Sequence, residues 1–196
     1  INPDLEEELI SELEGQRTFK EGKFYWLIAI IAFLWSIFQL YASYYPINST
    51  IVRSIHLTFA IILTYLIYPA KKTKYSLKTI QWFDYILAII GGIGVAYIAI
   101  DYVGLSNRPG DYLPRDIGFA IVSIVLLIEA SRRVLGLALG VVAVTFLVYD
   151  YFGQYMPELI SHKGASVQKL AGQMYLTTEG IFGVPLGVSA GFVFLF

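Results

Sequence analysis

Long apolar runs separated by short polar stretches dominate the pattern of this chain. The first three runs cover residues 24–45, 51–70 and 82–104, and the first reads FYWLIAIIAFLWSIFQLYASYY. Each is at least as long as the roughly 20 residues that an α-helix needs to cross a bilayer. Within a run the apolar residues are continuous, without the period of a strand or of an amphipathic helix. The pattern therefore predicts an all-α, polytopic membrane protein.

The next apolar stretch, 116–153, is longer and carries Glu129, Arg132 and Arg133 near its middle. As one helix it would be about 57 Å long, far more than the ~30 Å of a hydrocarbon core. We therefore expect two spans, 115–131 and 134–152, joined by a tight charged turn at 130–133. One long bent helix that lies partly in the interface is the alternative, because neither Gly nor Pro lies at 130–133.

After a polar stretch at 154–178, which includes a short interfacial helix around SVQKLAGQMYL, a sixth apolar segment begins near Gly180. The prediction is thus about five complete transmembrane helices and the start of a sixth. With the N-terminus in the cytoplasm, the inner segments contain nine of the fourteen Lys and Arg residues. Cytoplasmic loops are enriched in these residues, so the bias favours that orientation.

Residues 1–23 are acidic. Asn2 and Pro3 can begin a helix there, with Leu5, Leu9 and Leu13 on one stripe. This predicts a short cytoplasmic amphipathic helix, and a solvated acidic tail is the alternative. The segment is not a signal peptide, which needs a basic start before its apolar core.

Composition narrows the function classes. Apolar residues make up 57% of the chain and charged residues 15%, whereas a soluble domain carries about 25% charged residues. A net charge of −1 gives no indication of nucleic-acid binding, and the absence of cysteine removes thiolate chemistry. The sequence contains neither a phosphate-binding GxxxxGK[ST] loop nor HExxH. We therefore expect no enzyme, no catalytic residue and no metal site in this chain.

A few polar residues interrupt the apolar runs. Glu129 lies three and four residues before Arg132 and Arg133, which predicts an interfacial ion pair. Arg53 and His56 share a helix face. We interpret Arg53 as reaching outward to the interface and His56 as bonded to a neighbouring helix. A polar relay or a lipid-headgroup contact is the alternative. Asp101, at the end of the third run, is interpreted as solvated.

Small residues recur at helical spacing in three places. Gly136 and Gly140 form a GxxxG motif, and a second group lies in the third run. The last group falls on one face of the sixth segment, around Pro185. The group in the third run consists of Gly91, Gly92 and Gly94. The group around Pro185 consists of Gly183, Gly187 and Gly191. Spacing favours close helix packing for all three. For the last group, a helix broken at Pro185 that lines a polar cavity is the alternative.

Three strings, EASRR, FGQYMPELISHKG and above all MYLTTEGIFGVPLGVSAGFVFLF, resemble the fused permeases of TRAP transporters, the tripartite ATP-independent periplasmic transporters. The resemblance is to the TAXI subclass and extends over residues 24–196. It implies that 24–133 is the four-helix small subunit, that 134–153 is the connecting helix, and that 154–196 is an outer segment followed by the truncated first helix of the large subunit.

The resemblance also implies a function. Such permeases import organic acids, including dicarboxylates and glutamate-like acids, with Na⁺ across a bacterial or archaeal cytoplasmic membrane. A periplasmic TAXI-type binding protein delivers the substrate, and a mobile domain of the large subunit carries it past a fixed scaffold. The Na⁺ and substrate ligands of the family lie in large-subunit hairpins, so none is expected in this fragment. The implied partners are lipid, the rest of the large subunit and the binding protein.

On this view the outer polar segments dock the binding protein, and Arg108, Asp111 and Lys163 are the candidate docking residues. A structural or accessory membrane anchor without transport activity is the alternative function. A membrane enzyme would need a convergent cluster of buried polar groups, which the sequence does not indicate.

Overall fold

The computed structural model describes residues 15–19, 21–71, 73 and 77–193, and within them the chain is all-helical, without strands. Most of the predicted acidic segment, 1–14, lies outside these residues. The α-helices are α2 (Lys23–Tyr44), α3 (Ser49–Ile67), α5 (Trp82–Ile100), α6 (Tyr102–Asn107), α7 (Pro114–Leu135), α8 (Leu137–Phe152), α9 (Val167–Ala171) and α10 (Val184–Val188).

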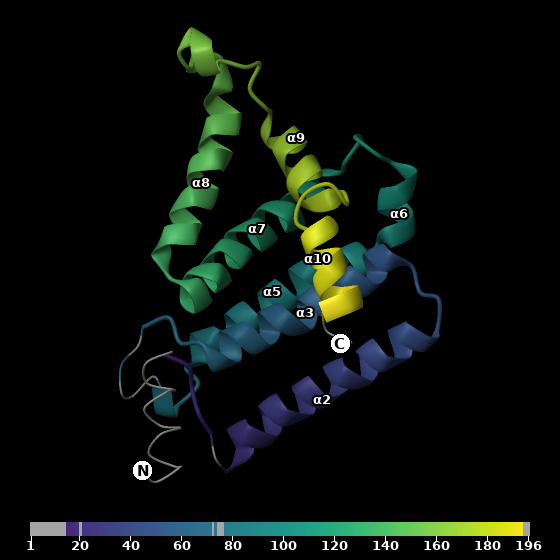
Figure 1. The fold of residues 1–196 in the computed structure, drawn as a ribbon, viewed down its shortest axis with the longest axis vertical. Coiled ribbons are helices and arrows are strands. Elements are labelled where there is room, and N and C mark those ends of the chain that lie inside the picture. The colour runs from purple at the N-terminus through teal and green to yellow at the C-terminus, as the bar shows by residue number, and fades with distance from the viewer. Residues whose placement is uncertain (1–14, 20, 72, 74–76, 194–196) are drawn as a thin grey trace.

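Helices α2, α3, α5 and α7 lie side by side and form a bundle (Figure 1). Helix α8 leaves this bundle at an angle and contacts α7 along part of its length. The chain then returns through α9, and the segment that ends in α10 lies against α3. The termini of the described chain therefore both lie at the bundle, while the far end of α8 projects away from it.

Four helical stretches are long and apolar enough to cross a membrane: Lys23–Tyr44, Ser49–Ile67, Trp82–Ile100 and Leu137–Tyr155. They indicate a multi-pass membrane protein in contact with lipid. Helix α7, which the sequence pattern predicts as a further span, is 22 residues long but carries charged residues in its first turn and in its last two turns. Its uncharged stretch, 117–128, covers only about 18 Å, so its composition alone does not define a span.

Two helices replace one at 116–153, as expected, but the break lies at Gly136 rather than at the charged residues 130–133. Helix α7 runs through those residues to Leu135. Gly136 has φ 87°, a conformation that favours glycine, and its N–H donates to the Arg132 carbonyl (3.0 Å). The turn is therefore set by a glycine cap, and the charges belong to the last turns of α7.

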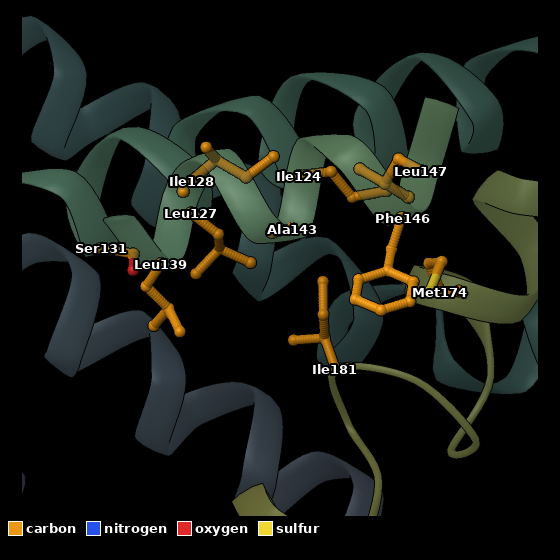
Figure 2. A pocket seen from close by; sticks show the side chains of 11 residues that line it. Ile124, Leu127, Ile128, Ser131, Leu139, Ala143, Phe146, Leu147, Met174 and Ile181 are labelled. Atoms are coloured by element: carbon orange, nitrogen blue, oxygen red, sulfur yellow. The ribbon is translucent and has the colours of Figure 1, made fainter. Parts of the chain in front are cut away.

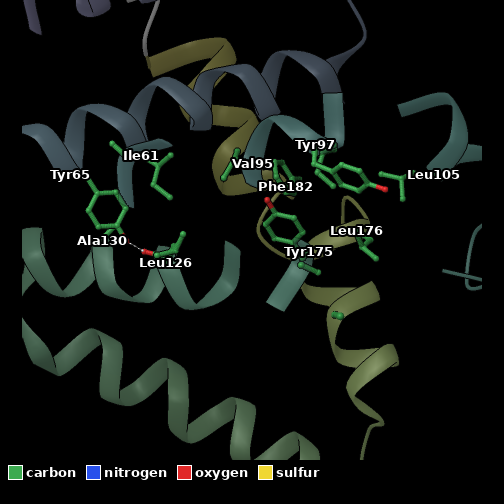
Figure 3. Close-up of a cluster of buried hydrophobic side chains, with 14 of the residues drawn as sticks. Ile61, Tyr65, Val95, Tyr97, Leu105, Leu126, Ala130, Tyr175, Leu176 and Phe182 are labelled. Carbon is green, nitrogen blue, oxygen red and sulfur yellow. Dashed lines mark hydrogen bonds between the residues drawn. The ribbon is translucent and has the colours of Figure 1, made fainter. Parts of the chain in front are cut away.

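The core of the bundle is built from α3, α5 and α7, and the returning segment 171–182 completes it (Figure 3). Gly91 and Gly92 allow α5 to approach α3: a Cβ there would lie 3.0 Å from Ile61 and 2.9 Å from Ile62. This confirms the close packing predicted for that glycine group. Tyr65, fully buried, donates from its hydroxyl to the Leu126 carbonyl of α7 (2.7 Å).

The stretch after α8 is irregular. Two short 3₁₀ turns, Gly153–Tyr155 and Glu158–Ile160, precede α9, which continues into a π-helical turn at Gly172–Leu176. The sixth apolar segment becomes helical only at Val184, with Pro185 in the first turn of α10, and a second π-helical turn follows at Ser189–Val193. Pro185 therefore starts a helix and removes no hydrogen bond from a helix interior.

Candidate functional site

The most unusual arrangement is the junction at which α2 and α3 contact the C-terminal segment. Arg53 of α3 donates from Nη1 to the carbonyl of Phe182 (2.7 Å) and more weakly to that of Gly183 (3.4 Å). These carbonyls lie just before α10, where the backbone leaves helical geometry. Arg53 was expected to reach outward to the interface, but its guanidinium is partly buried and bonds to the non-helical turn before α10.

Gln39 and His56 complete this junction. Gln39 is the buried residue of α2 and donates from Nε2 to the Ala190 carbonyl (2.6 Å). His56 lies 3.4 Å from the Ser189 hydroxyl and packs edge-on against Trp35 of α2, with ring centroids 4.9 Å apart. The contact of His56 with another segment agrees with the interpretation of this residue from the sequence. The junction thus bonds two helices to the π-helical turn.

Tyr175 makes the matching contact on the α5 side. Its hydroxyl donates to the Gly94 carbonyl (3.0 Å), and its buried ring packs edge-on against Phe182 at 5.2 Å. In an apolar environment an irregular backbone is stable only where protein groups satisfy its carbonyls. Arg53, Gln39 and Tyr175 therefore fix the broken segment to the bundle.

A second polar arrangement, here called the inner cluster, consists of Arg17, Asp84, Glu129, Arg132 and Arg133. At its centre, Asp84 is fully buried at the start of α5. It accepts from Arg17 Nη2 at 2.5 Å and from Arg133 Nη1 at 2.7 Å. One buried carboxylate thus pairs with two buried guanidinium groups that lie far apart in the sequence, and Glu129 provides a second counter-charge for Arg133.

The arginines of the inner cluster also cap helix α3. Arg17 donates from Nη1 to the carbonyls of Tyr65 (3.3 Å) and Leu66 (2.8 Å), and Arg133 donates to that of Tyr68 (3.0 Å). Carbonyls at a helix C-terminus lack partners within the helix, and they carry partial negative charge. The two guanidinium groups therefore stabilise the end of α3.

The predicted Glu129 pair lies at the edge of the inner cluster. Glu129 accepts from Arg132 Nε at 2.7 Å and from Arg133 Nε at 3.0 Å. Arg133 also lies over the ring of Tyr65, 4.7 Å from its centroid. The i+3 and i+4 spacing predicts the contacts of Glu129. The ion pairs of Asp84 with Arg133 and Arg17 join residues far apart in the chain.

A third arrangement, the outer cluster, lies at the opposite ends of α5 and α7. Its members are Tyr97, Asp101, Arg108, Arg115 and Asp116. Arg108 bonds to Asp101 and, through Nε, to the fully buried Asp116 (3.0 Å). The Arg108 hydrogen bond lowers the pKa of Asp101, and Asp116 and Asp101 raise the pKa of Arg108.

The outer cluster changes the interpretation of two residues. Asp101, expected to be solvated, is ion-paired and about a quarter exposed. Arg108, a candidate docking residue, has its guanidinium engaged by two carboxylates that hold the α5–α7 connection together. The signal was present in the sequence: a short connection between antiparallel helices brings Asp101 and Asp116 to the base of the loop that carries Arg108.

The other docking candidates lie at the surface, Asp111 in the α6–α7 loop and Lys163 between α8 and α9. Asp111 is exposed, and its backbone N–H donates to the Arg108 carbonyl (3.2 Å). Lys163 lines a polar hollow of about 310 Å³ beside the end of α8. A neighbouring hollow of about 450 Å³ lies between the α6–α7 loop and α9 and includes Lys169 and Glu179. These side chains remain available to a partner.

Where α7 and α8 diverge, they enclose an apolar cleft of about 340 Å³ (Figure 2). Ile124, Leu127 and Ile128 line one side, and α8 provides the opposite side with Phe146. Met174 and the turn before α10 close the cleft at one end. Because its lining is almost entirely hydrocarbon, the cleft offers no polar group to orient a water-soluble substrate.

The predicted packing glycines occupy different environments. Gly140 faces α7, since a Cβ there would lie 3.7 Å from Ile128. Gly136 forms the turn, and a Cβ there would have no neighbour within 4 Å. Gly187 allows the Arg53 guanidinium to approach: a Cβ would lie 2.7 Å from its Nη2. Gly183 lies in the turn against backbone carbonyls, and a Cβ on Gly191 would meet open space. The prediction of one packing face therefore fails, because the segment is not one continuous helix.

Comparison with known proteins does not assign the chain to a family: no family model, curated protein or solved structure matches it.

Proposed function

We propose that this chain is the fixed scaffold of a TRAP-type permease of the TAXI subclass, which imports organic acids with Na⁺ and a periplasmic binding protein. The observation that carries the proposal concerns residues 174–193. This stretch has the strongest family resemblance. It is also the stretch whose broken backbone accepts from Arg53 and Gln39, and whose Tyr175 donates to the Gly94 carbonyl of α5. Interrupted helices held at an intramembrane junction are typical of secondary transporters.

The proposal includes an arrangement in the membrane. Five helices cross it with the N-terminus in the cytoplasm, and α7 is one of them, because it packs beside α3 and α5 in the same bundle. Helix α8 is then the connecting helix, and the segment from Val184 begins the large subunit. The divergence of α8 from the bundle is consistent with a connecting role (Figure 1).

In this role the chain performs no chemistry. Substrate and Na⁺ are bound by the mobile domain of the permease, and the scaffold resists the force of that movement. Buried ion pairs at one end of the bundle and a network of carboxylates and guanidinium groups at the other are suited to this task, since they join helices by directional contacts.

The test is uptake by the complete permease in liposomes, with and without the binding protein and an inward Na⁺ gradient. Wild type is expected to accumulate a radiolabelled dicarboxylate only when both are present. Arg53→Met, which removes the bond to the Phe182 carbonyl, is expected to abolish uptake, while Arg53→Lys retains part of it. Uptake that proceeds without the gradient and the binding protein would contradict the proposal. Uptake by the rest of the permease alone would favour an accessory anchor.

Docking of the binding protein needs variants that leave the outer cluster intact. We expect Asp111→Lys and Lys163→Glu, at exposed positions, to weaken uptake at limiting binding protein and to have less effect at saturating amounts. Lys78→Glu, on the predicted cytoplasmic side, is the matched control. Unchanged uptake by both outer variants at limiting binding protein excludes these residues from docking.

A further inference from the structure

The surface of the bundle carries a shallow groove between α5 and α7 with one arginine at its end. Its volume is about 410 Å³, and its lining is apolar apart from that arginine: Ile90, Ile93, Gly94, Arg115, Gly118, Phe119 and Val122. Ile90 and Ile93 are among the exposed apolar residues of the bundle. The groove therefore faces the surroundings of the bundle, which the four candidate spans indicate to be lipid.

The groove follows the axis of α7. Arg115 lies in the first turn of this helix and Val122 two turns later, about 10 Å further along the axis. Between them, Gly118 leaves open space, since a Cβ at this position would have no neighbour within 4 Å. A glycine in a helix interior is less favourable than alanine by about 1 kcal/mol, so Gly118 does not serve to stabilise helix α7.

Arg115 can accept another anionic partner. Its side chain is 59% exposed, and its contacts within the described residues are made by Nη2 with Asp101 (3.2 Å) and by Nε with Asp116 (3.6 Å). Neither contact uses Nη1. Arg108 pairs with the same two carboxylates, so the outer cluster contains two acidic and two basic side chains. An incoming phosphate therefore does not meet an excess of negative charge.

We propose that this groove binds a glycerophospholipid, with one acyl chain along Gly118 and the headgroup phosphate on Arg115. The apolar lining matches a hydrocarbon chain that runs parallel to the helices. A guanidinium fork matches phosphate oxygens in geometry and charge. An apolar protein helix fits less well, because it would cover the exposed Nη1 of Arg115 without offering it an acceptor. This inference does not depend on the transport function proposed above.

The experiment is native mass spectrometry of the purified protein in detergent, with phosphatidylglycerol as the probe. Diacylglycerol with identical acyl chains is the comparison, because it lacks only the phosphate and headgroup. We expect phosphatidylglycerol to bind about tenfold more tightly, which is the size of one charge-assisted hydrogen bond. Arg115→Gln is expected to reduce phosphatidylglycerol binding to the level of diacylglycerol, and excess inorganic phosphate is not expected to displace the lipid.

A second variant tests the groove itself. Gly118→Leu fills the open space without disturbing helix geometry and is expected to weaken binding of both lipids. Ile121→Phe, an enlargement at an exposed position of α7 outside the groove, and Lys163→Gln, the loss of an outer charge elsewhere, are the controls. Circular dichroism verifies the fold of every variant.

Equal binding of the two lipids, or unchanged phosphatidylglycerol binding in Arg115→Gln, overturns the headgroup assignment. Unchanged binding in Gly118→Leu overturns the acyl-chain site. Displacement by inorganic phosphate alone shows an anion site instead of a lipid site, and losses in the controls as large as those in the groove variants show non-specific association with the apolar surface.

Discussion

The two charged clusters lie at opposite ends of the same helices, yet they are built differently. In the inner cluster, Arg17 and Arg133 reach Asp84 across 67 and 49 residues of sequence, and all three side chains are buried. In the outer cluster the ion pairs join residues of one helix–loop–helix connection, and Arg108 lies only 7 and 8 residues from its partners. One cluster joins distant segments, and the other closes a loop.

This difference indicates how each cluster acts. A buried charge that loses its partner remains in an environment of low polarity, so the whole inner cluster depends on Asp84. In the outer cluster Arg108 and Asp101 are partly exposed, so water can replace a lost partner there. The buried Asp116 keeps its bonds from the Tyr97 hydroxyl and the Leu113 N–H when Arg108 is lost. The inner cluster should therefore determine whether the bundle forms, whereas the outer cluster should determine how tightly one connection is held.

The largest effect is expected for Asp84→Asn. It leaves the guanidinium groups of Arg17 and Arg133 buried without a full counter-charge, which costs about 3–5 kcal/mol in the free energy of unfolding. Equilibrium unfolding in a denaturing detergent measures the loss. Asp111→Asn, the same chemical change at an exposed site, is the control and should be close to neutral. A small loss at Asp84 would show that the inner cluster does not hold the bundle together.

A smaller effect is expected for Asp116→Asn in the outer cluster. The side chain is fully buried, but it accepts from Arg108, from Tyr97 and from the Leu113 N–H, and an amide keeps some of these bonds. The expected loss is about 1–3 kcal/mol in the same unfolding assay. A loss equal to that of Asp84→Asn would remove the distinction between the clusters.

The salt dependence of stability should further distinguish the two clusters. Arg108→Gln is expected to destabilise the protein less than either acidic variant, and the difference from wild type should shrink as NaCl is raised, because exposed charges are screened. Thermal unfolding at low and high salt measures this. The effect of Asp84→Asn should vary little over the same range. If the Arg108 effect is independent of salt, its ion pairs are shielded from solvent.

The smallest effect concerns pH. The Arg108 hydrogen bond lowers the pKa of Asp101 below its usual value of 3.8 in the folded protein. The stability that Asp101 contributes is therefore fully present above pH 3.8 and is lost as the pH falls through the lower folded pKa. The difference in melting temperature between wild type and Asp101→Asn should thus persist at pH 4 and narrow in stronger acid. Narrowing already near pH 5 would contradict the direction of this shift.

Much of the fold follows from the sequence, because long apolar runs define helices by length alone. The boundaries of α2, α3, α5 and α8 lie within a few residues of the predicted runs. The predicted break at 130–133 is wrong because charged residues do not end this helix, whereas Gly136 does. The shape of 177–193 was not predictable from glycine spacing, since that spacing defines a face only on an unbroken helix.

The candidate site was less predictable. The Glu129 contacts follow from i+3 and i+4 spacing, but the role of Arg17 depends on how the end of α3 meets the start of α5. The sequence places Arg53 on the correct helix, but the direction of its side chain depends on the Phe182 carbonyl, 129 residues later. Local spacing predicts contacts within a helix, whereas contacts between segments need the packing.

The single glycine between α7 and α8 has a mechanical consequence. Only Gly136 separates two helices, so the direction of α8 depends on very few backbone dihedral angles. With 16 residues, α8 is a lever of about 24 Å, and a rotation of 10° at its base displaces its far end by about 4 Å. A side chain at position 136 would strain φ 87° and shift that lever, so one residue sets where everything after α8 begins.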